Sequence, residues 1–200
     1  NFFATGGDSI KSIQIVSRLR QEGYDLTVKD IFISPTIREL ASQLRKLSQI
    51  TEQGVVTGVA PLSPIQRVFL ESTFTGKHHF NQSALLHFPA GLSVSRAQQL
   101  FTHLQEHHDA LRMVFVQDGV QENRGTDMSL WLEEHDLRNN ASDAVALYDR
   151  LQSGIDLASG PLMRIGLYHF NDGSRVLMVI HHLVIDGVSW RILFEDIATL

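Results

Sequence analysis

Cysteine is absent from this 200-residue sequence, so no disulfide framework can form. A chain without cysteine suits a reducing compartment, and we expect a cytoplasmic protein. The first residues also lack the positively charged and apolar regions of a secretory signal peptide. The apolar run from Val176 to Ile180 is far too short to cross a bilayer, which takes about 20 residues. The sequence therefore predicts no membrane partner.

Positive charge is scarce as well. The formal net charge is -5, and no basic stripe with interleaved aromatic residues is visible, which argues against nucleic acid as a partner. With 43% hydrophobic and 20% charged residues, the composition is that of a globular protein with one large domain or two small ones. Internal repeats and low-complexity tracts are absent. Both ends lie inside patterned sequence, so we expect the chain to be an excised part of a longer protein.

The strongest pattern in the sequence is a strand followed by a loop and a helix, near the C-terminus. The run from Val176 to Ile180 is apolar and rich in β-branched residues, which predicts a strand buried on both faces. His181 and His182 end this run, and Asp186-Gly187 is a turn signal. A helical period then begins, with apolar residues at positions i, i+3, i+4 and i+7: Trp190, Leu193, Phe194 and Ile197.

The two histidines are the candidate catalytic residues. Neighbouring side chains on a strand point to opposite faces, so one imidazole can face a cavity while the other faces the core. Imidazole takes up and returns protons near neutral pH, which suits general acid–base chemistry. Asp186 can fix the loop by pairing with a basic group, or it can orient a histidine. The alternative is that both histidines only pack. No metal site is predicted, because adjacent strand residues diverge and no further ligand stands at helical spacing to complete a tetrahedral site.

The first 47 residues predict a small helical unit. Asp8 or Ser9 can cap the first helix after a pair of glycines, and Gly23 can stop that helix. A second helix is predicted to open at Ser34-Pro35, with a capping hydroxyl and a proline at the first helical position. The segment between these helices, Val28 to Ile33, is a short helix or a loop.

Ser9 has three competing interpretations. It can be a plain helix cap without further function. It can be a hydrolase nucleophile, but no strand leads into it and no Gly-x-Ser-x-Gly elbow surrounds it. It can also carry a covalent phosphate group, because the dipole and free amides of a helix N-terminus favour an attached phosphate.

Residues 48–60 lose the helical period and are typical of a linker, and residues 61–200 predict a second domain. Helices alternate there with strands and hairpins, which indicates an α/β layered fold. We expect a helix opening at Pro61 to Gln66, a helix capped by Ser93 and a helix over Asp143 to Leu151. The strands are expected over Ser83 to Phe88, Leu111 to Val116 and Leu162 to Phe170, with a hairpin signal at Asp118-Gly119.

Two stretches resemble domains of non-ribosomal peptide synthetases. Phe2 to Gln14, with Gly6-Gly7-Asp8-Ser9 at its centre, is similar to their peptidyl carrier domains, although the first helix of that domain is missing. Residues 61–200 are similar to their condensation and epimerization domains. The matching motifs are Pro64-Ile65-Gln66, Asp109-Ala110-Leu111-Arg112, Ile155-Asp156-Leu157 with Gly160-Pro161-Leu162, and His181-His182-x-x-x-Asp186-Gly187. This resemblance implies the first lobe of a chloramphenicol-acetyltransferase-like fold.

Within that group, the chain looks more like an epimerization domain. Gly187-Val188-Ser189-Trp190-Arg191 and His78-His79-Phe80-Asn81-Gln82-Ser83 carry this finer resemblance, as does a carrier with Asp8-Ser9-Ile10-Lys11 directly upstream. The implied reaction is inversion of Cα, from L to D, in an aminoacyl or peptidyl thioester. A condensation domain that forms a peptide bond, and a docking module without turnover, are the alternatives.

The resemblance also implies roles for single residues and partners. Ser9 would carry 4'-phosphopantetheine, added by a phosphopantetheinyl transferase, and His182 would be the acid–base residue. His181, Asp186 and Gly187 would support the motif, and Arg112 is a candidate partner for Asp186. A glutamate of the other lobe would face His182, and no residue of this chain is assigned to it. The expected neighbours are an adenylation domain upstream and a condensation domain downstream or in trans.

Overall fold

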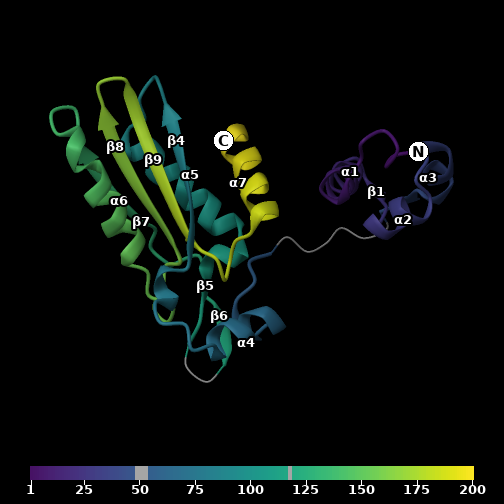
Figure 1. The fold of residues 1–200 in the computed structure, drawn as a ribbon, viewed down its shortest axis with the longest axis horizontal. Helices are drawn as coiled ribbons and strands as arrows, with labels where there is room; N and C mark the ends of the chain where they lie inside the picture. The colour runs from purple at the N-terminus through teal and green to yellow at the C-terminus, as the bar shows by residue number, and fades with distance from the viewer. Residues whose placement is uncertain (48–53, 117–118) are drawn as a thin grey trace. The chain divides into compact units, whose positions relative to one another are not determined.

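The computed structural model describes residues 1–47, 54–116 and 119–200. The chain divides into two compact units, Asn1–Gln53 and Gly54–Leu200, and each is described here by itself (Figure 1). Among the described residues, no helix has both the length and the apolar character needed to cross a membrane.

The first unit is a small bundle of helices with a two-stranded ladder. Its elements in chain order are α1 (Ser9–Gln21), β1 (Tyr24–Asp25), α2 (Val28–Ile33), α3 (Ile37–Gln43) and β2 (Arg45–Lys46). The side chain of Asp8 caps α1 by accepting a hydrogen bond from the backbone N–H of Lys11, at 2.8 Å. Gly23 has a φ of +80°, a conformation that favours glycine, and it directly follows the last turn of α1. Val16, Leu26 and Ile31 form the buried core.

The second predicted helix begins later than expected. It is α3, and its N-cap is Thr36, whose hydroxyl accepts from the backbone N–H of Glu39. Ser34 instead ends α2 and accepts a hydrogen bond from the Gln43 side chain at 2.8 Å. The Ser34-Pro35 prediction was wrong because Thr36 offers the same capping chemistry two residues further along.

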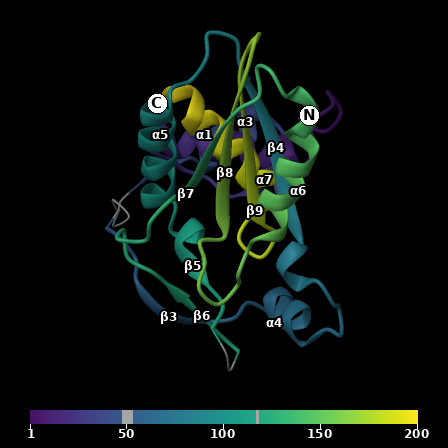
Figure 2. The same ribbon diagram turned by 90° about the vertical axis from the view of Figure 1, so that its left-hand side faces the viewer.

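The second unit is built on a four-stranded mixed sheet. Its strands lie in the order β4 (Asn81–Phe88), β9 (Gly173–His181), β8 (Met163–Phe170) and β7 (Trp131–Asp136), and Figure 2 shows them in this order. The β8–β9 and β9–β4 pairs are antiparallel, and β7 is parallel to β8. Strand β9 therefore lies inside the sheet, between β4 and β8, and it carries the candidate histidines at its end.

Helices cover both faces of this sheet (Figure 1). Helices α5 (Val94–His107) and α7 (Gly187–Thr199) pack against one face, where their core residues meet Val176, Met178 and Ile180 of β9. Helix α6 (Ala144–Ser153) covers the other face, where it meets Leu177 and Val179. The expectations of a strand buried on both faces and of an α/β layered fold are confirmed.

A smaller antiparallel sheet and one further helix complete the second unit. The sheet has the order β3 (Gly58–Pro61), β6 (Val120–Asn123) and β5 (Met113–Val114), and the helix is α4 (Pro64–Glu71). Single 3-10 turns lie at Lys77–His79, Asp109–Arg112 and Ala141–Asp143. The helix expected to open over Pro61 to Gln66 is α4, and Ser63 and Gln66 form a capping box at its start.

Three expectations in this unit need correction or fall outside the structure. The expected linker ends in β3, because Gly58 to Pro61 pair with β6. The expected strand over Leu111 to Val116 is mostly a 3-10 turn, and only Met113–Val114 form β5. Strand β7 was not predicted. The hairpin signal at Asp118-Gly119 is only partly covered, because Asp118 lies outside the described residues. Residues 48–53 of the expected linker lie outside them as well.

Candidate functional site

His181 ends β9 and points into the core. Its side chain is fully buried and lies on the face of the sheet that α6 covers, edge-on to the ring of Phe69. Its Nε2 lies 2.6 Å from the carbonyl oxygen of Lys77, and its Nδ1 lies 3.2 Å from the backbone N of Leu183. A carbonyl only accepts and an N–H only donates, so Nε2 carries the proton and the ring is neutral. Burial lowers the pKa of His181, which also favours the neutral form.

His182 lies on the opposite side of the chain and is exposed. Its backbone N–H donates to the carbonyl of Phe80 at 2.9 Å, which extends the β4–β9 ladder by one pair. Its ring stacks on the Phe80 ring, with centroids 5.2 Å apart. Its Nδ1 lies 2.7 Å from the carbonyl oxygen of Ile185. The expectation that one imidazole is buried in the core is therefore confirmed, and His182 is the exposed imidazole of the pair.

Gln82 and Trp190 contact the other side of this ring. The Gln82 side-chain nitrogen lies 3.1 Å from Nε2 of His182, and the Trp190 indole N–H donates to the Gln82 side-chain oxygen at 2.8 Å. The sequence pattern counted Trp190 among the apolar residues of the predicted helix and gave Gln82 no role. A polar Asn-Gln-Ser triplet at the start of an otherwise apolar strand is the sequence signal that could have identified Gln82.

Asp186 caps the helix that follows the histidine loop. Its Oδ1 accepts hydrogen bonds from the backbone N–H groups of Val188 and Ser189, at 3.0 and 2.8 Å, and from the Ser189 hydroxyl at 2.7 Å. The Ser189 backbone N–H is the main reason that the pKa of the Asp186 carboxyl lies below its usual value. Gly187 is the first residue of α7. Asp186 thus fixes the loop through a helix cap.

Arg112 does not pair with Asp186, so that expectation was wrong. Its guanidinium is fully buried and donates to the carbonyl oxygens of Gln105 and Glu106 at the end of α5 and to that of Arg124. It also forms an ion pair with Asp109. The helix cap already satisfies the Asp186 carboxylate, while the carbonyls at the end of α5 need donors. The Arg112 side chain therefore has a structural role in the buried interior of the second unit.

Ser9 stands at the first position of α1 and is exposed. In the part of the chain that the structure describes, no hydrogen bond involves its hydroxyl. Lys11 lies two residues along and contacts Asp8 at 3.6 Å. An exposed hydroxyl at a helix N-terminus fits a covalently attached phosphate ester.

Of the remaining histidine pairs, His78-His79 lies between Lys77, which contacts His181, and Phe80, which stacks on His182, whereas His107-His108 lies at the end of α5. His78 and His79 are exposed in a 3-10 turn. His108 contacts Asp196 of α7 at 2.7 Å, and His107, His108 and Asp196 form a group whose ligand atoms lie within 4.8 Å of one another. The sequence interpretation named no metal ligand here. The short His108–Asp196 contact accounts for the proximity by itself, since it ties the end of α5 to α7.

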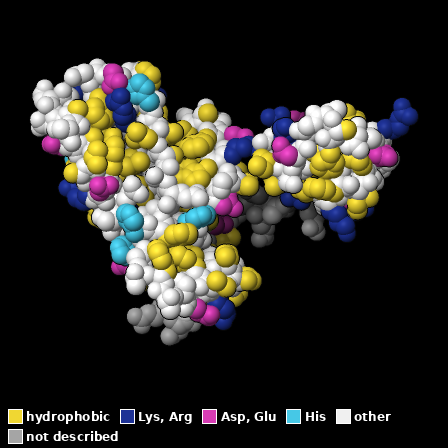
Figure 3. Space-filling view, viewed as in Figure 1, with side chains coloured by type: hydrophobic (Ala, Val, Ile, Leu, Met, Phe, Trp, Pro, Cys, Tyr) yellow, Lys and Arg dark blue, Asp and Glu magenta, His cyan; other side chains and the backbone are white. Residues whose placement is uncertain are grey.

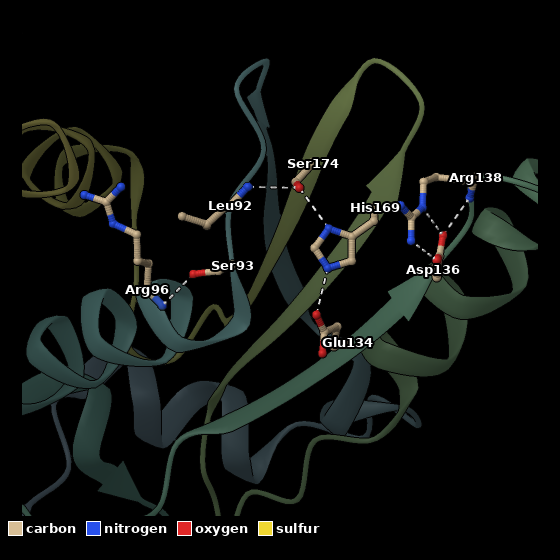
Figure 4. Close-up of polar contacts among 8 residues, drawn as sticks. All are labelled: Leu92, Ser93, Arg96, Glu134, Asp136, Arg138, His169 and Ser174. Carbon is tan, nitrogen blue, oxygen red and sulfur yellow. Dashed lines mark hydrogen bonds and ion pairs between the residues drawn. The ribbon is translucent and has the colours of Figure 1, made fainter.

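A second polar cluster lies at the far end of the sheet, beside the β8–β9 hairpin (Figure 4). His169 contacts the Ser174 hydroxyl at 3.0 Å and Glu134 at 2.8 Å, an arrangement that has the composition of a hydrolase triad. Ser174 is only 1% exposed, however, and its oxygen already accepts the backbone N–H of Leu92 at 3.0 Å. The cluster therefore ties the β4–α5 connection to the hairpin, and a buried hydroxyl cannot attack a substrate.

Known proteins match both units. The family described as "Condensation domain" matches residues 56–200, and the family described as "Phosphopantetheine attachment site" matches residues 1–44. Tyrocidine synthase 2 from Brevibacillus parabrevis is 47% identical over 206 residues, and Gramicidin S synthase 1 from Brevibacillus brevis is 43% identical over 206 residues. Both alignments cover 100% of this chain, which spans 6% of the first relative and 19% of the second.

A solved structure gives the same result for the fold. The crystal structure of the epimerization domain from the third module of tyrocidine synthetase B is 45% identical to this chain, with a TM-score of 0.71. The match covers 74% of this chain and 35% of that domain structure, which agrees with one lobe of a chloramphenicol-acetyltransferase-like fold. The chain therefore belongs to the condensation-domain family of non-ribosomal peptide synthetases, and it carries a phosphopantetheine attachment site ahead of that domain.

Proposed function

We propose that this chain takes part in epimerization, from L to D, of the Cα of an aminoacyl or peptidyl thioester that is attached through phosphopantetheine to Ser9. The observation that carries the proposal is the contrast between the two histidines. His181 is buried and uses both ring nitrogens in the core, whereas His182 is exposed and holds its Nε2 as a proton acceptor. The 45% identity to an epimerization domain supports inversion over the other reactions of the family.

In the proposed reaction, His182 acts as the base. The phosphopantetheine arm, once attached, would supply a thioester whose carbonyl acidifies the neighbouring Cα–H. Nε2 of His182 forms a bond to this hydrogen as the Cα–H bond breaks, and the bonding electron pair stays on the substrate. Nδ1 keeps its hydrogen bond to the Ile185 carbonyl, which stabilises the imidazolium. Return of a proton to the opposite face completes the inversion, and we assign no residue of this chain to the acid on that face.

Ser9 is the proposed attachment point because its hydroxyl is exposed at the start of α1. Exposed apolar side chains surround this helix end and the neighbouring helices of the first unit: Ile10, Ile13, Phe32, Ile33 and Ile37. Figure 3 shows apolar patches on that unit. We propose that residues 1–47 serve as the carrier and residues 61–200 as one lobe of the catalytic domain. The further proposed partners are an adenylation domain, a condensation domain and a phosphopantetheinyl transferase.

Solvent isotope exchange tests the proposal. The complete synthetase is loaded with an L-aminoacyl group in deuterium oxide, and the released amino acid is examined for Cα deuterium and for configuration. We expect deuterium at Cα and a mixture of L and D forms, and we expect His182→Ala to abolish both. His103→Ala is the matched control, because His103 is an exposed histidine of the same unit on α5. Exchange that survives in His182→Ala would refute the assignment of the base.

The same experiment tests peptide-bond formation, which the match to the family described as "Condensation domain" favours. In that case the loaded amino acid would keep its configuration and would wait for a second loaded carrier. An L-aminoacyl group that incorporates no deuterium, but forms a dipeptide when an acceptor is added, would replace epimerization by condensation.

A further inference from the structure

We infer that Gln82 and Trp190 are positioning residues that hold His182 in one neutral tautomer, with Nδ1 protonated and Nε2 as the proton acceptor. The inference rests on the proposed function insofar as it concerns the same imidazole. Gln82 contacts the ring directly and Trp190 acts through Gln82, and neither is assigned a proton transfer to or from the substrate.

The sheet register brings Gln82 to the histidine. Gln82 of β4 pairs with Ile180 of β9, and the ladder continues through the hydrogen bond from His182 to Phe80. Residues two apart on a strand share a face, so Gln82 and Phe80 lie on the face that also carries Ile180 and His182. Phe80 stacks directly on the ring, and Gln82 reaches its edge from the diagonal position.

Helix α7 brings Trp190 to the same place. The backbone N–H of Trp190 donates to the carbonyl of Asp186 at 3.0 Å, so Trp190 lies one turn inside the helix that Asp186 caps. Because the cap fixes where α7 begins, it also fixes the position of the Trp190 indole relative to the sheet. The hydrogen bonds between Trp190, Gln82 and His182 link α7, β4 and the end of β9.

The chemistry of the three groups allows one proton arrangement. An indole N–H only donates, so the atom of Gln82 that faces it at 2.8 Å is the amide oxygen. The amide nitrogen is then the atom 3.1 Å from Nε2 of His182, and since it donates, Nε2 must offer its lone pair. The Ile185 carbonyl leads independently to the same tautomer, because it accepts from Nδ1.

Only the neutral tautomer with a free Nε2 lone pair matches the hydrogen bonds around the ring. An imidazolium carries N–H on both nitrogens, and its Nε2–H would then face the N–H of Gln82. The amide cannot flip to present its oxygen without turning its nitrogen towards the Trp190 indole N–H, which would leave two donors facing each other. In the absence of substrate the amide occupies the single lone pair of Nε2. In the proposed reaction, a substrate Cα–H takes the place of the amide at this lone pair.

Gln82→Glu is the decisive variant. A carboxylate of almost the same size still accepts from Trp190, but it offers an acceptor to Nε2 in place of a donor. With the ring nitrogens of histidine labelled with 15N in the 200-residue chain, we expect the wild-type His182 spectrum at pH 7.5 to show Nδ1–H with an unprotonated Nε2. In Gln82→Glu, we expect a spectrum with a proton on Nε2. Gln98→Glu makes the same change on the exposed face of α5 and leaves the His182 spectrum unchanged.

Kinetics in the complete synthetase provide the second readout. We expect Gln82→Glu to lower the rate constant for Cα deuterium exchange at saturating substrate by about 100-fold, the usual contribution of a correctly protonated base, with KM about unchanged. Trp190→Phe keeps the ring packing but frees the amide to flip, so its 15N spectrum is expected to show both tautomers of His182. An unchanged His182 spectrum in both variants would overturn the inference.

The two readouts separate this inference from the proposed function. A His182 spectrum that changes in Gln82→Glu, in a protein whose wild type exchanges no Cα hydrogen, would support the positioning role and refute epimerization. A wild type that exchanges Cα hydrogen, with a His182 spectrum that Gln82→Glu leaves unchanged, would support epimerization and refute the positioning role.

Discussion

Acidification is expected to destabilise the second unit through His181, and the effect follows from where that side chain lies. The ring is fully buried and neutral, with Nε2 donating to Lys77 and Nδ1 accepting from Leu183. Burial lowers the pKa of His181 from its ordinary value of 6.5, so the unfolded chain binds a proton here at a higher pH than the folded protein does. The stability that the neutral ring contributes is therefore present above pH 6.5 and is lost as the pH falls from there through the folded-state pKa.

The size of the effect follows from proton linkage. One proton that is bound only by the unfolded state lowers the free energy of unfolding by at most about 1.4 kcal/mol per pH unit. His181→Gln removes this titration and keeps an amide that can donate to Lys77. At pH 7.5 we expect the variant to be less stable than wild type by about 1–3 kcal/mol, the cost of an imperfectly satisfied buried group. Only wild type loses the His181 contribution in acid. The difference in free energy of unfolding between wild type and His181→Gln is therefore expected to narrow by about 1 kcal/mol between pH 7.5 and pH 5.5.

Denaturant unfolding followed by tryptophan fluorescence measures the free energy of unfolding of both proteins at each pH. The two tryptophans of the sequence, Trp131 and Trp190, both lie in the unit of residues 54–200, so the first unit does not contribute to the signal. Histidines elsewhere titrate in both proteins and cancel in the difference. His103→Gln is the control, because His103 is exposed on α5 and its variant should follow the wild-type pH dependence. Parallel pH dependences for wild type and His181→Gln would refute the assignment of His181 as a neutral core residue.

Three further predictions follow from the structure. Ser9→Ala is expected to abolish the mass increase caused by a phosphopantetheinyl transferase, while Ser17→Ala, on the exposed side of the same helix, keeps it. A mass increase that persists in Ser9→Ala would show that the attachment site is another residue. Ser174→Ala should lower the free energy of unfolding of the second unit by about 1–3 kcal/mol, because the Leu92 N–H loses its acceptor, and an unchanged denaturation midpoint would show that the cluster is dispensable. Arg112→Met should cost on the order of 3 kcal/mol in the same assay, because buried carbonyls at the end of α5 lose their donors, and a loss below about 1 kcal/mol would contradict that role.

Local patterns in the sequence predicted most of the lobe. The apolar run at Val176 to Ile180 identified the central strand, and Ser93 and the motif from Pro61 to Gln66 identified the starts of two helices, because capping and burial depend on neighbouring residues. Strand β7 was missed because Trp131 to Asp136 lacks an apolar alternation. Its pairing with β8 and its position at the sheet edge come from tertiary structure, which no short window of sequence reveals.

The site was only partly predictable, for the same reason. His181 and His182 follow from strand alternation, so their opposite orientations could be expected from the sequence. The contact between Gln82 and His182 joins residues 100 positions apart and depends on the register of β4 against β9. The expected pairing of Arg112 with Asp186 failed because both groups found closer backbone partners: carbonyls at the end of α5 for the arginine, and amides at the start of α7 for the aspartate.

The hydrogen bond from His182 to Ile185 spans only three residues, and this short reach has a consequence for how the imidazole is held. Donor and acceptor belong to one tight loop, so the contact at Nδ1 depends only on neighbouring residues. The contact of Nε2 with Gln82, in contrast, depends on the pairing of β4 with β9. A substitution that shifts β4 would therefore alter the surroundings of one ring nitrogen and leave those of the other in place.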